Sequence, residues 1–150
     1  MNTKENGKDN TFTANISIGE KELYDNEITD MILEILTKEF QAMTGDPNQM
    51  ECRKYHILRS ILENNQISGN GKKIGAQLKK IMSNIDILNT KCRKQLKQLG
   101  FSVNDEGKHH KIYFHDDKRY PLIVAKTASD CRSYKNLAST ACRMLSFVNM

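Results

Sequence analysis

The sequence predicts an α+β protein in which N-terminal helices precede a C-terminal αβββα domain. Between residues 20 and 99, apolar residues recur at intervals of three and four, which is the period of amphipathic helices. After Gly100 the pattern changes to the alternation typical of strands, and a helical period returns near the C-terminus. A chain of 150 residues has the size of one compact domain with a helical extension.

The first 71 residues are expected to contain a tail and two helices. Residues 1–18 have no helical period and few large apolar groups, so they predict a disordered tail. The region 19–71 is acidic to mixed in charge, and its periodicity predicts helices over about 20–43 and 48–64. Gly45-Asp46-Pro47 separates the two helices because glycine and proline end helical patterns.

A basic αβββα domain is expected over residues 72–150, and it begins with the longest helical pattern of the chain. One helix over about 72–99 would place an apolar seam on a single side, and Gly100 would end it. Ser83-Asn84 leaves open whether this stretch is one helix or two. The seam consists of Ile74, Leu78, Ile81, Ile85, Leu88, Cys92, Leu96 and Leu99.

Three short strands follow Gly100. The alternating pattern predicts strands over 101–103, 109–114 and 120–125. We expect the first turn to span residues 104–108. Pro121, near the start of the third strand, indicates that this strand is an edge strand or enters the sheet late, because proline cannot donate a hydrogen bond to a neighbouring strand.

A last helix is expected to begin near Ser129 or Ser133 and to run to about Val148. Its small residues would let it pack closely against the sheet. The inward-facing side chains are expected to be Leu137, Ala138, Ala141, Cys142, Leu145 and Val148.

The charge is divided unevenly along the chain. Residues 1–50 carry four lysines against ten acidic residues, a net charge of −6. The other hundred residues carry 19 Lys and Arg against 8 acids, a net charge of +11. A basic region of this size indicates a polyanionic partner, and nucleic acid is the usual one. The acidic first helix could also lie against the basic surface and mask it.

Several classes of protein are excluded or disfavoured by what the sequence lacks. Its longest apolar runs fall far short of the roughly 18 residues that cross a bilayer, so no membrane association is expected. Met1–Asn10 is polar, unlike the apolar core of a secretory signal, so we expect a cytoplasmic protein with free thiols. The cysteines and histidines have no ligand spacing, so neither a metal site nor a cofactor is expected.

The region from about residue 87 to residue 147 resembles the αβββα fold shared by double-stranded-RNA-binding domains and HicA-type mRNA interferase toxins. The HicA pattern is a leucine-rich helix ending in Gly-Phe, a strand, and then Gly-Ser-His before an apolar strand. Gly100-Phe101, Gly107 and His109 match this pattern, and Lys108 replaces the serine. The resemblance implies that His109 is the catalytic residue of a metal-independent endoribonuclease.

The double-stranded-RNA-binding pattern matches the same turn at a different histidine. Gly107, His110 and Phe114 fit it, with Lys108 in place of a proline. That family opens its last helix with a lysine-rich run, and residues 133–138 resemble a weakened version of that run. This resemblance implies binding to a phosphate backbone without cleavage.

Three interpretations of function therefore stand beside one another. We favour a non-catalytic nucleic-acid-binding protein, with RNA as the expected partner, or a basic subunit of a nucleoprotein complex. A HicA-like endoribonuclease using His109 and a helical interaction or oligomerisation protein are the alternatives. In the last case a protein partner, or a second copy, would bind the N-terminal helices.

A reader of A-form RNA needs a basic helix, a protruding polar turn and a cationic helix start at fixed separations. Each phosphate contact would make binding weaken with salt. The residues expected to bind nucleic acid are Lys91, Arg93, Lys94, Lys97, Lys108, His109, His110, Lys111, Arg132 and Lys135.

Overall fold

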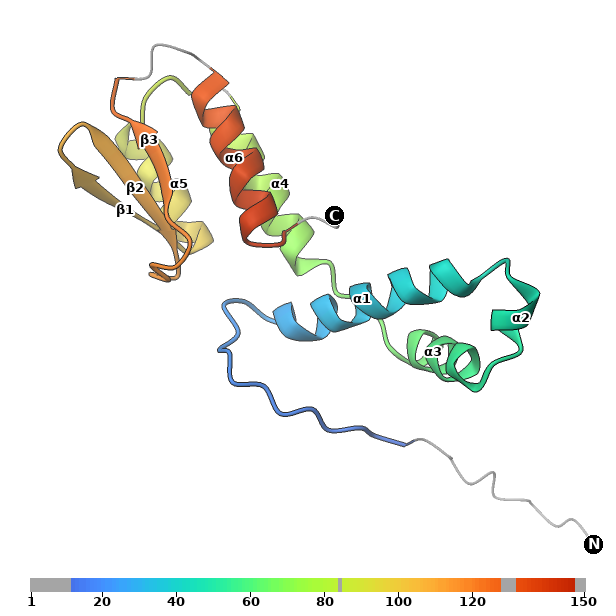
Figure 1. Cartoon of the computed structure of the whole chain (residues 1–150). Coiled ribbons are helices and arrows are strands. Elements are labelled where there is room, and N and C mark those ends of the chain that lie inside the picture. The colour runs from blue at the N-terminus through green and yellow to red at the C-terminus, as the bar shows by residue number, and fades with distance from the viewer. Residues whose placement is uncertain (1–11, 84, 128–131, 148–150) are drawn as a thin grey trace, which may run out of the picture.

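The computed structural model describes residues 12–83, 85–127 and 132–147, and it confirms the α+β class (Figure 1). Helices fill the N-terminal part, and a three-stranded antiparallel sheet and a final helix follow. No helix in this part of the chain is long and apolar enough to cross a membrane. The elements are α1 (Glu27–Met43), α2 (Pro47–Met50), α3 (Arg53–Asn64), α4 (Asn70–Met82), α5 (Thr90–Leu99), β1 (Phe101–Glu106), β2 (His109–Phe114), β3 (Leu122–Ala125) and α6 (Arg132–Met144).

The sheet has the order β1-β2-β3, so β3 lies at an edge, as Pro121 predicts. β1 continues to Glu106, which pairs with His109, and only Gly107-Lys108 form the turn. The prediction of a turn over 104–108 was therefore wrong. Gly107 has a φ of 53°, and glycine with positive φ at the first turn position is the pattern of a tight type II′ hairpin.

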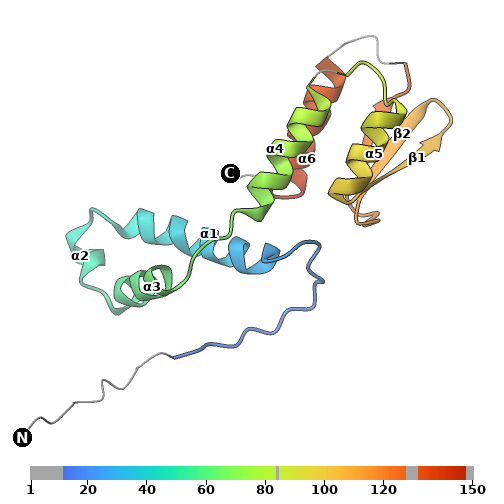
Figure 2. The same cartoon turned by 180° about the vertical axis from the view of Figure 1, so that it is seen from behind.

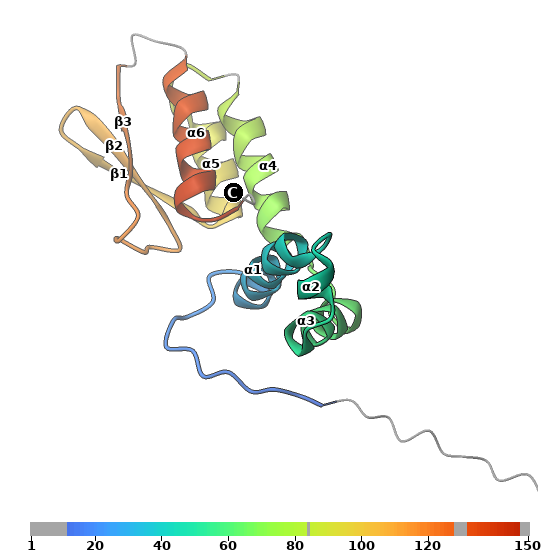
Figure 3. The same cartoon turned by 45° about the vertical axis from the view of Figure 1, so that its right-hand side comes forward.

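The domain formed by α4 to α6 has three layers. α5 packs on β1 and α6 packs on β3, both on the same face of the sheet, and α4 covers the two helices from the other side (Figure 3). The core lies between these layers. Its most deeply buried side chains are Leu78, Met82, Leu96, Phe101, Ile112, Phe114, Tyr134, Cys142 and Phe147.

The stretch 72–99 forms two helices, which decides the question left open by Ser83-Asn84. α4 ends at Met82 and α5 begins at Thr90, where the side chain of Asn89 accepts a hydrogen bond from the Cys92 amide at 2.9 Å. The apolar seam is thereby divided between two layers. Leu78 packs in the α4 layer, and Leu96 packs in the α5 layer against the sheet.

The helices α1, α2 and α3 form a separate unit with a small core of their own. Phe40 and Tyr55 stack with ring centroids 4.8 Å apart. Met43 and Leu58 are buried beside them. This core shares no buried residue with the core of the larger domain.

The first helix begins at Glu27 and not near Glu20 as predicted. The Glu22 and Glu27 carboxylates accept hydrogen bonds from the amides of Ile28 and Leu23, at 3.2 and 2.6 Å. These side-chain bonds hold residues 20–26 as bends and turns ahead of the helix. Of the predicted tail, residues 1–11 lie outside the described part of the chain, and residues 12–19 are extended and exposed.

Asp30 joins the α1–α3 unit to the larger domain. Its buried carboxylate accepts hydrogen bonds from the Ser68 amide (2.8 Å), the Ser68 hydroxyl (2.5 Å) and the Gly69 amide (3.1 Å) just before α4. Acidic α1 thus lies at the start of α4, at the opposite end of the domain from the β1–β2 turn (Figures 1 and 2). α1 does not cover the surface around that turn (Figures 1 and 2). The acidic helix therefore does not mask the basic residues there, as the charge distribution had suggested it could.

Candidate nucleic-acid interface

The start of α5, the β1–β2 turn and the start of α6 lie at one end of the domain (Figure 1). Arg93 in the first turn of α5 bonds Asp105 near the end of β1, at 3.3 Å. The Lys126 amide, just after β3, donates to the Lys108 carbonyl oxygen in the turn at 2.9 Å. These contacts fix the spacing of the elements on which the predicted binding residues lie.

Six exposed or partly exposed basic residues belong to these three places, and we call them the cationic end. They are Lys91, Lys94, Lys108, Lys126, Arg132 and Lys135. Within the described part of the chain, Lys91, Lys94, Lys108 and Lys135 make no ion pair. Lys97, although exposed, lies in the last turn of α5 and therefore at the other end of that helix.

Three of the predicted binding residues contact acids, namely Arg93, Lys111 and His110. Arg93 is held by Asp105 and also donates to the Leu88 carbonyl oxygen at 3.3 Å. Lys111 bonds Glu106 at 2.5 Å, which raises the pKa of Lys111 and lowers that of Glu106. These two ion pairs neutralise the charges of Asp105 and Glu106, the acids near the β1–β2 turn.

The adjacent histidines of β2 face opposite sides of the sheet, because side chains alternate along a strand. His110 lies on the side of the helices, where its side chain is 8% exposed and its Nδ1 is 2.5 Å from Asp105 Oδ1. This bond is the main cause of the lowered pKa of Asp105, and Arg93 adds to it. His110 is therefore buried in the structure, although it is among the residues expected to bind nucleic acid at the surface.

His109 lies exposed on the open face of the sheet. It is opposite Glu106 on β1 and Ala125 on β3. Among the described residues it has no hydrogen-bond partner that would orient its ring, which a positioned general acid or base normally has. No group of three or more His, Cys, Asp or Glu side chains in the described ranges could hold a metal ion.

Tyr134 lies beneath the cationic end and was not singled out by the sequence. It is fully buried in the first turn of α6, and burial raises its pKa against smaller opposing effects of the Leu88 backbone and Arg93. Its hydroxyl makes no hydrogen bond of ordinary geometry with the described residues. Tyrosine in the first turn of a helix gives no sequence signal of burial, because its hydroxyl would normally reach water or a partner.

Lys126 also lies at this surface, although it is not among the predicted binding residues. Its position could have been predicted from the strand order, because antiparallel pairing brings the residue after β3 next to the β1–β2 turn.

Comparison of the chain with known proteins finds no matching family model, no matching curated protein and no matching solved structure. The order and pairing of the elements from α5 to α6 are compatible with an αβββα arrangement.

Proposed function

We propose that this protein binds nucleic acid, with RNA as the preferred partner, through the cationic end. It acts without cleaving its partner, alone or as a basic subunit of a nucleoprotein complex. The observation that supports this most directly is the convergence of basic side chains from three elements at one end of the domain. The nearby acids Asp105 and Glu106 are already paired with cations and so oppose an anion less.

The charges at the helix starts give a second reason. Neither α5 nor α6 has an acidic residue in its first turn. Cations there face the positive end of the helix dipole, which costs the free protein stability. An anion bound near these helix starts would relieve this cost.

RNA is favoured over DNA because of the form of the surface. A-form RNA presents phosphates and 2′-hydroxyls across a wide, shallow minor groove, which proteins recognise by shape with a helix and a projecting turn. Here the tight Gly107-Lys108 turn projects beside two basic helix starts (Figure 1). The compatible αβββα arrangement supports the resemblance to double-stranded-RNA-binding domains.

The test is fluorescence anisotropy with labelled duplex RNA, duplex DNA and single-stranded RNA at increasing salt. Lys94→Glu and Lys135→Glu should weaken binding and reduce the slope of log affinity against log salt by about one per lost phosphate contact. Lys73→Glu is the matched control, because Lys73 is exposed in the first turn of α4, far from the turn. Equal losses in all three variants, or affinity independent of salt, would contradict the proposal.

Cleavage by His109 is the second candidate function. It is supported by the exposed imidazole beside Lys108, since a histidine next to a cation can assist cleavage of RNA through attack of a 2′-hydroxyl. Gel analysis of the same RNA distinguishes the two. Fragments that disappear in His109→Ala would establish a nuclease, and intact RNA with both proteins would exclude one.

A protein partner at the N-terminal helices is a third proposal. Ile35 on α1 is 61% exposed and Ile57 on α3 is 44% exposed. Burial of such apolar side chains by a partner lowers the free energy and so stabilises the complex. Loss of a co-purifying partner in Ile35→Lys, with unchanged RNA binding, would locate that partner there.

A further inference from the structure

The N-terminal arm, residues 12–18, has the pattern of a strand without a sheet. Its backbone is extended, and Phe12, Ala14, Ile16 and Ile18 alternate with small polar residues. Phe12, Ile16 and Ile18 are 87, 65 and 46% exposed. The arm also lies within the longest uncharged stretch of the chain, residues 10–19. Apolar side chains in this arrangement favour addition to the edge of a sheet.

β3 offers such an edge. Among the described residues it pairs only with β2, so its outer side has free backbone hydrogen-bonding groups. An open groove of about 380 Å³ runs between this edge and α6. Leu122, Val124, Asn136, Leu137 and Thr140 are among the lining residues, none of which is charged.

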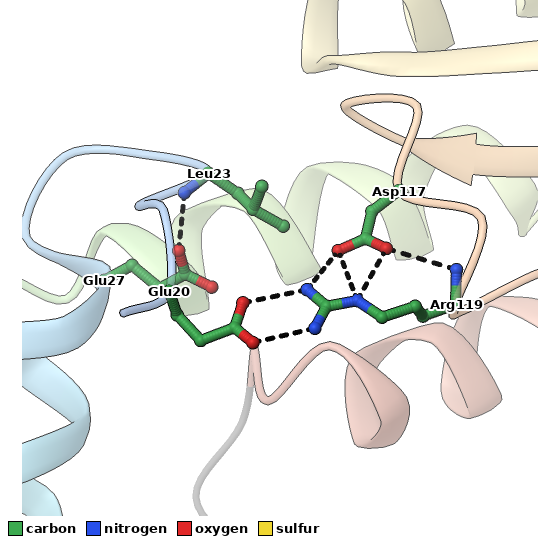
Figure 4. Close-up of polar contacts among 5 residues, drawn as sticks. All are labelled: Glu20, Leu23, Glu27, Asp117 and Arg119. Atoms are coloured by element: carbon green, nitrogen blue, oxygen red, sulfur yellow. Dashed lines mark hydrogen bonds and ion pairs between the residues drawn. The ribbon is translucent and has the colours of Figure 1, made fainter. Parts of the chain in front are cut away.

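We propose that the arm of one copy of this chain binds along the outer edge of β3 in a second copy, and that the exchange is reciprocal. A second copy is favoured over the arm's own edge because, from its anchored base, the arm leads away from its own sheet (Figure 1). Glu20 makes two bonds to Arg119, at 2.7 and 2.9 Å, and Asp117 also holds Arg119 (Figure 4).

The arm and the groove match in length, charge and polarity. Seven extended residues span roughly 23 Å, more than enough to cover the four residues of β3. An uncharged arm meets an uncharged groove, so no charge is buried without a partner. The apolar face of the arm can continue the face formed by Leu122 and Val124 over α6.

Two-fold symmetry makes each contact twice. Each arm then has to bury only about 400 Å² for the dimer to reach the roughly 1,600 Å² of a standard protein interface. Main-chain hydrogen bonds to the edge would supply affinity, and the alternating side chains would supply specificity.

Sedimentation equilibrium of the full chain over a range of concentrations tests the proposal. We expect a dimer whose dissociation constant rises by about 100-fold or more in Ile16→Asp, since an apolar anchor is replaced by a charge in both copies. Asn136→Arg, in the groove, should act in the same way. The matched controls are Asn15→Asp, on the other side of the arm, and Ser139→Arg, exposed on α6 outside the groove, and both should stay dimeric.

Mixing the two variants provides a second, independent test. Ile16→Asp retains an intact groove and Asn136→Arg retains an intact arm, so a mixture should form a heterodimer at concentrations where neither variant dimerises alone. A monomeric wild-type chain, including one that folds its arm onto its own edge, would overturn the proposal. So would a dimer that is unaffected by Ile16→Asp and Asn136→Arg, or a mixture that stays monomeric.

Discussion

Replacing Asp30 by alanine should loosen the joint between the α1–α3 unit and the larger domain. The carboxylate is buried and accepts two backbone amides and one hydroxyl from Ser68 and Gly69. In Asp30→Ala these partly buried donors lose their acceptor. An unsatisfied buried donor costs about 1–3 kcal/mol, although water entering the vacated space recovers part of that.

We therefore expect Asp30→Ala to lower the free energy of unfolding by about 3 kcal/mol. Asp30→Asn should cost about half as much, because its amide keeps one accepting oxygen and presents donors where the other oxygen was. The two variants together separate loss of hydrogen bonds from loss of packing volume.

Urea unfolding followed by circular dichroism measures both effects through the midpoint and the slope. Asp86→Ala is the control, since Asp86 is exposed in the loop before α5 and should change stability by no more than about 0.5 kcal/mol. An Asp30→Ala protein within about 0.5 kcal/mol of wild type would refute the view that this carboxylate holds the two units together.

Two further predictions concern the base of the cationic end. Tyr134→Phe should leave the free energy of unfolding unchanged or raise it by up to about 1 kcal/mol, because it removes a buried hydroxyl without an ordinary hydrogen bond. A clear fall in the thermal unfolding temperature would show that the hydroxyl has a partner. The lowered pKa of Asp105 stabilises the fold above the ordinary aspartate pKa of about 3.9, and this contribution is lost as pH falls through the lowered value. Asp105→Asn should thus have a flatter stability profile below about pH 4 than wild type, and an unchanged acid slope would contradict this.

Regular periodicity allowed much of the fold to be predicted from the sequence. The last helix buries Leu137, Ala138, Ala141 and Cys142, as its spacing indicates, and Leu145 is buried just after the helix ends at Met144, earlier than predicted; Val148 lies outside the described residues. Helical and strand periods report which face is apolar, and burial of that face dominates the energetics of each element.

Boundaries that depend on side-chain bonds or on pairing were not predictable in the same way. The delayed start of α1 depends on Glu22 and Glu27 bonding specific amides. β1 continues through Asn104, Asp105 and Glu106, whose polar character gives no strand signal. Their pairing with β2 extends the strand because the Gly107-Lys108 turn sets the register.

The candidate interface shows the same division. That basic residues lie on α5, the turn and the start of α6 was predictable from order along the chain. Which of them are paired was not, because the Arg93–Asp105 and His110–Asp105 contacts depend on the packing of α5 against the sheet. The opposite orientations of the two histidines, in contrast, follow from side-chain alternation along β2.

The position of α6 has a consequence for folding during synthesis. This helix supplies some of the most buried side chains of the domain, Tyr134, Ala141 and Cys142, yet it is synthesised after the sheet on which it packs. Until α6 is made, the apolar faces of α4 and β3 that it covers stay open to solvent. Between the synthesis of β3 and that of α6 the sheet is therefore only partly covered, a stage at which exposed strand edges favour aggregation and chaperones are most needed.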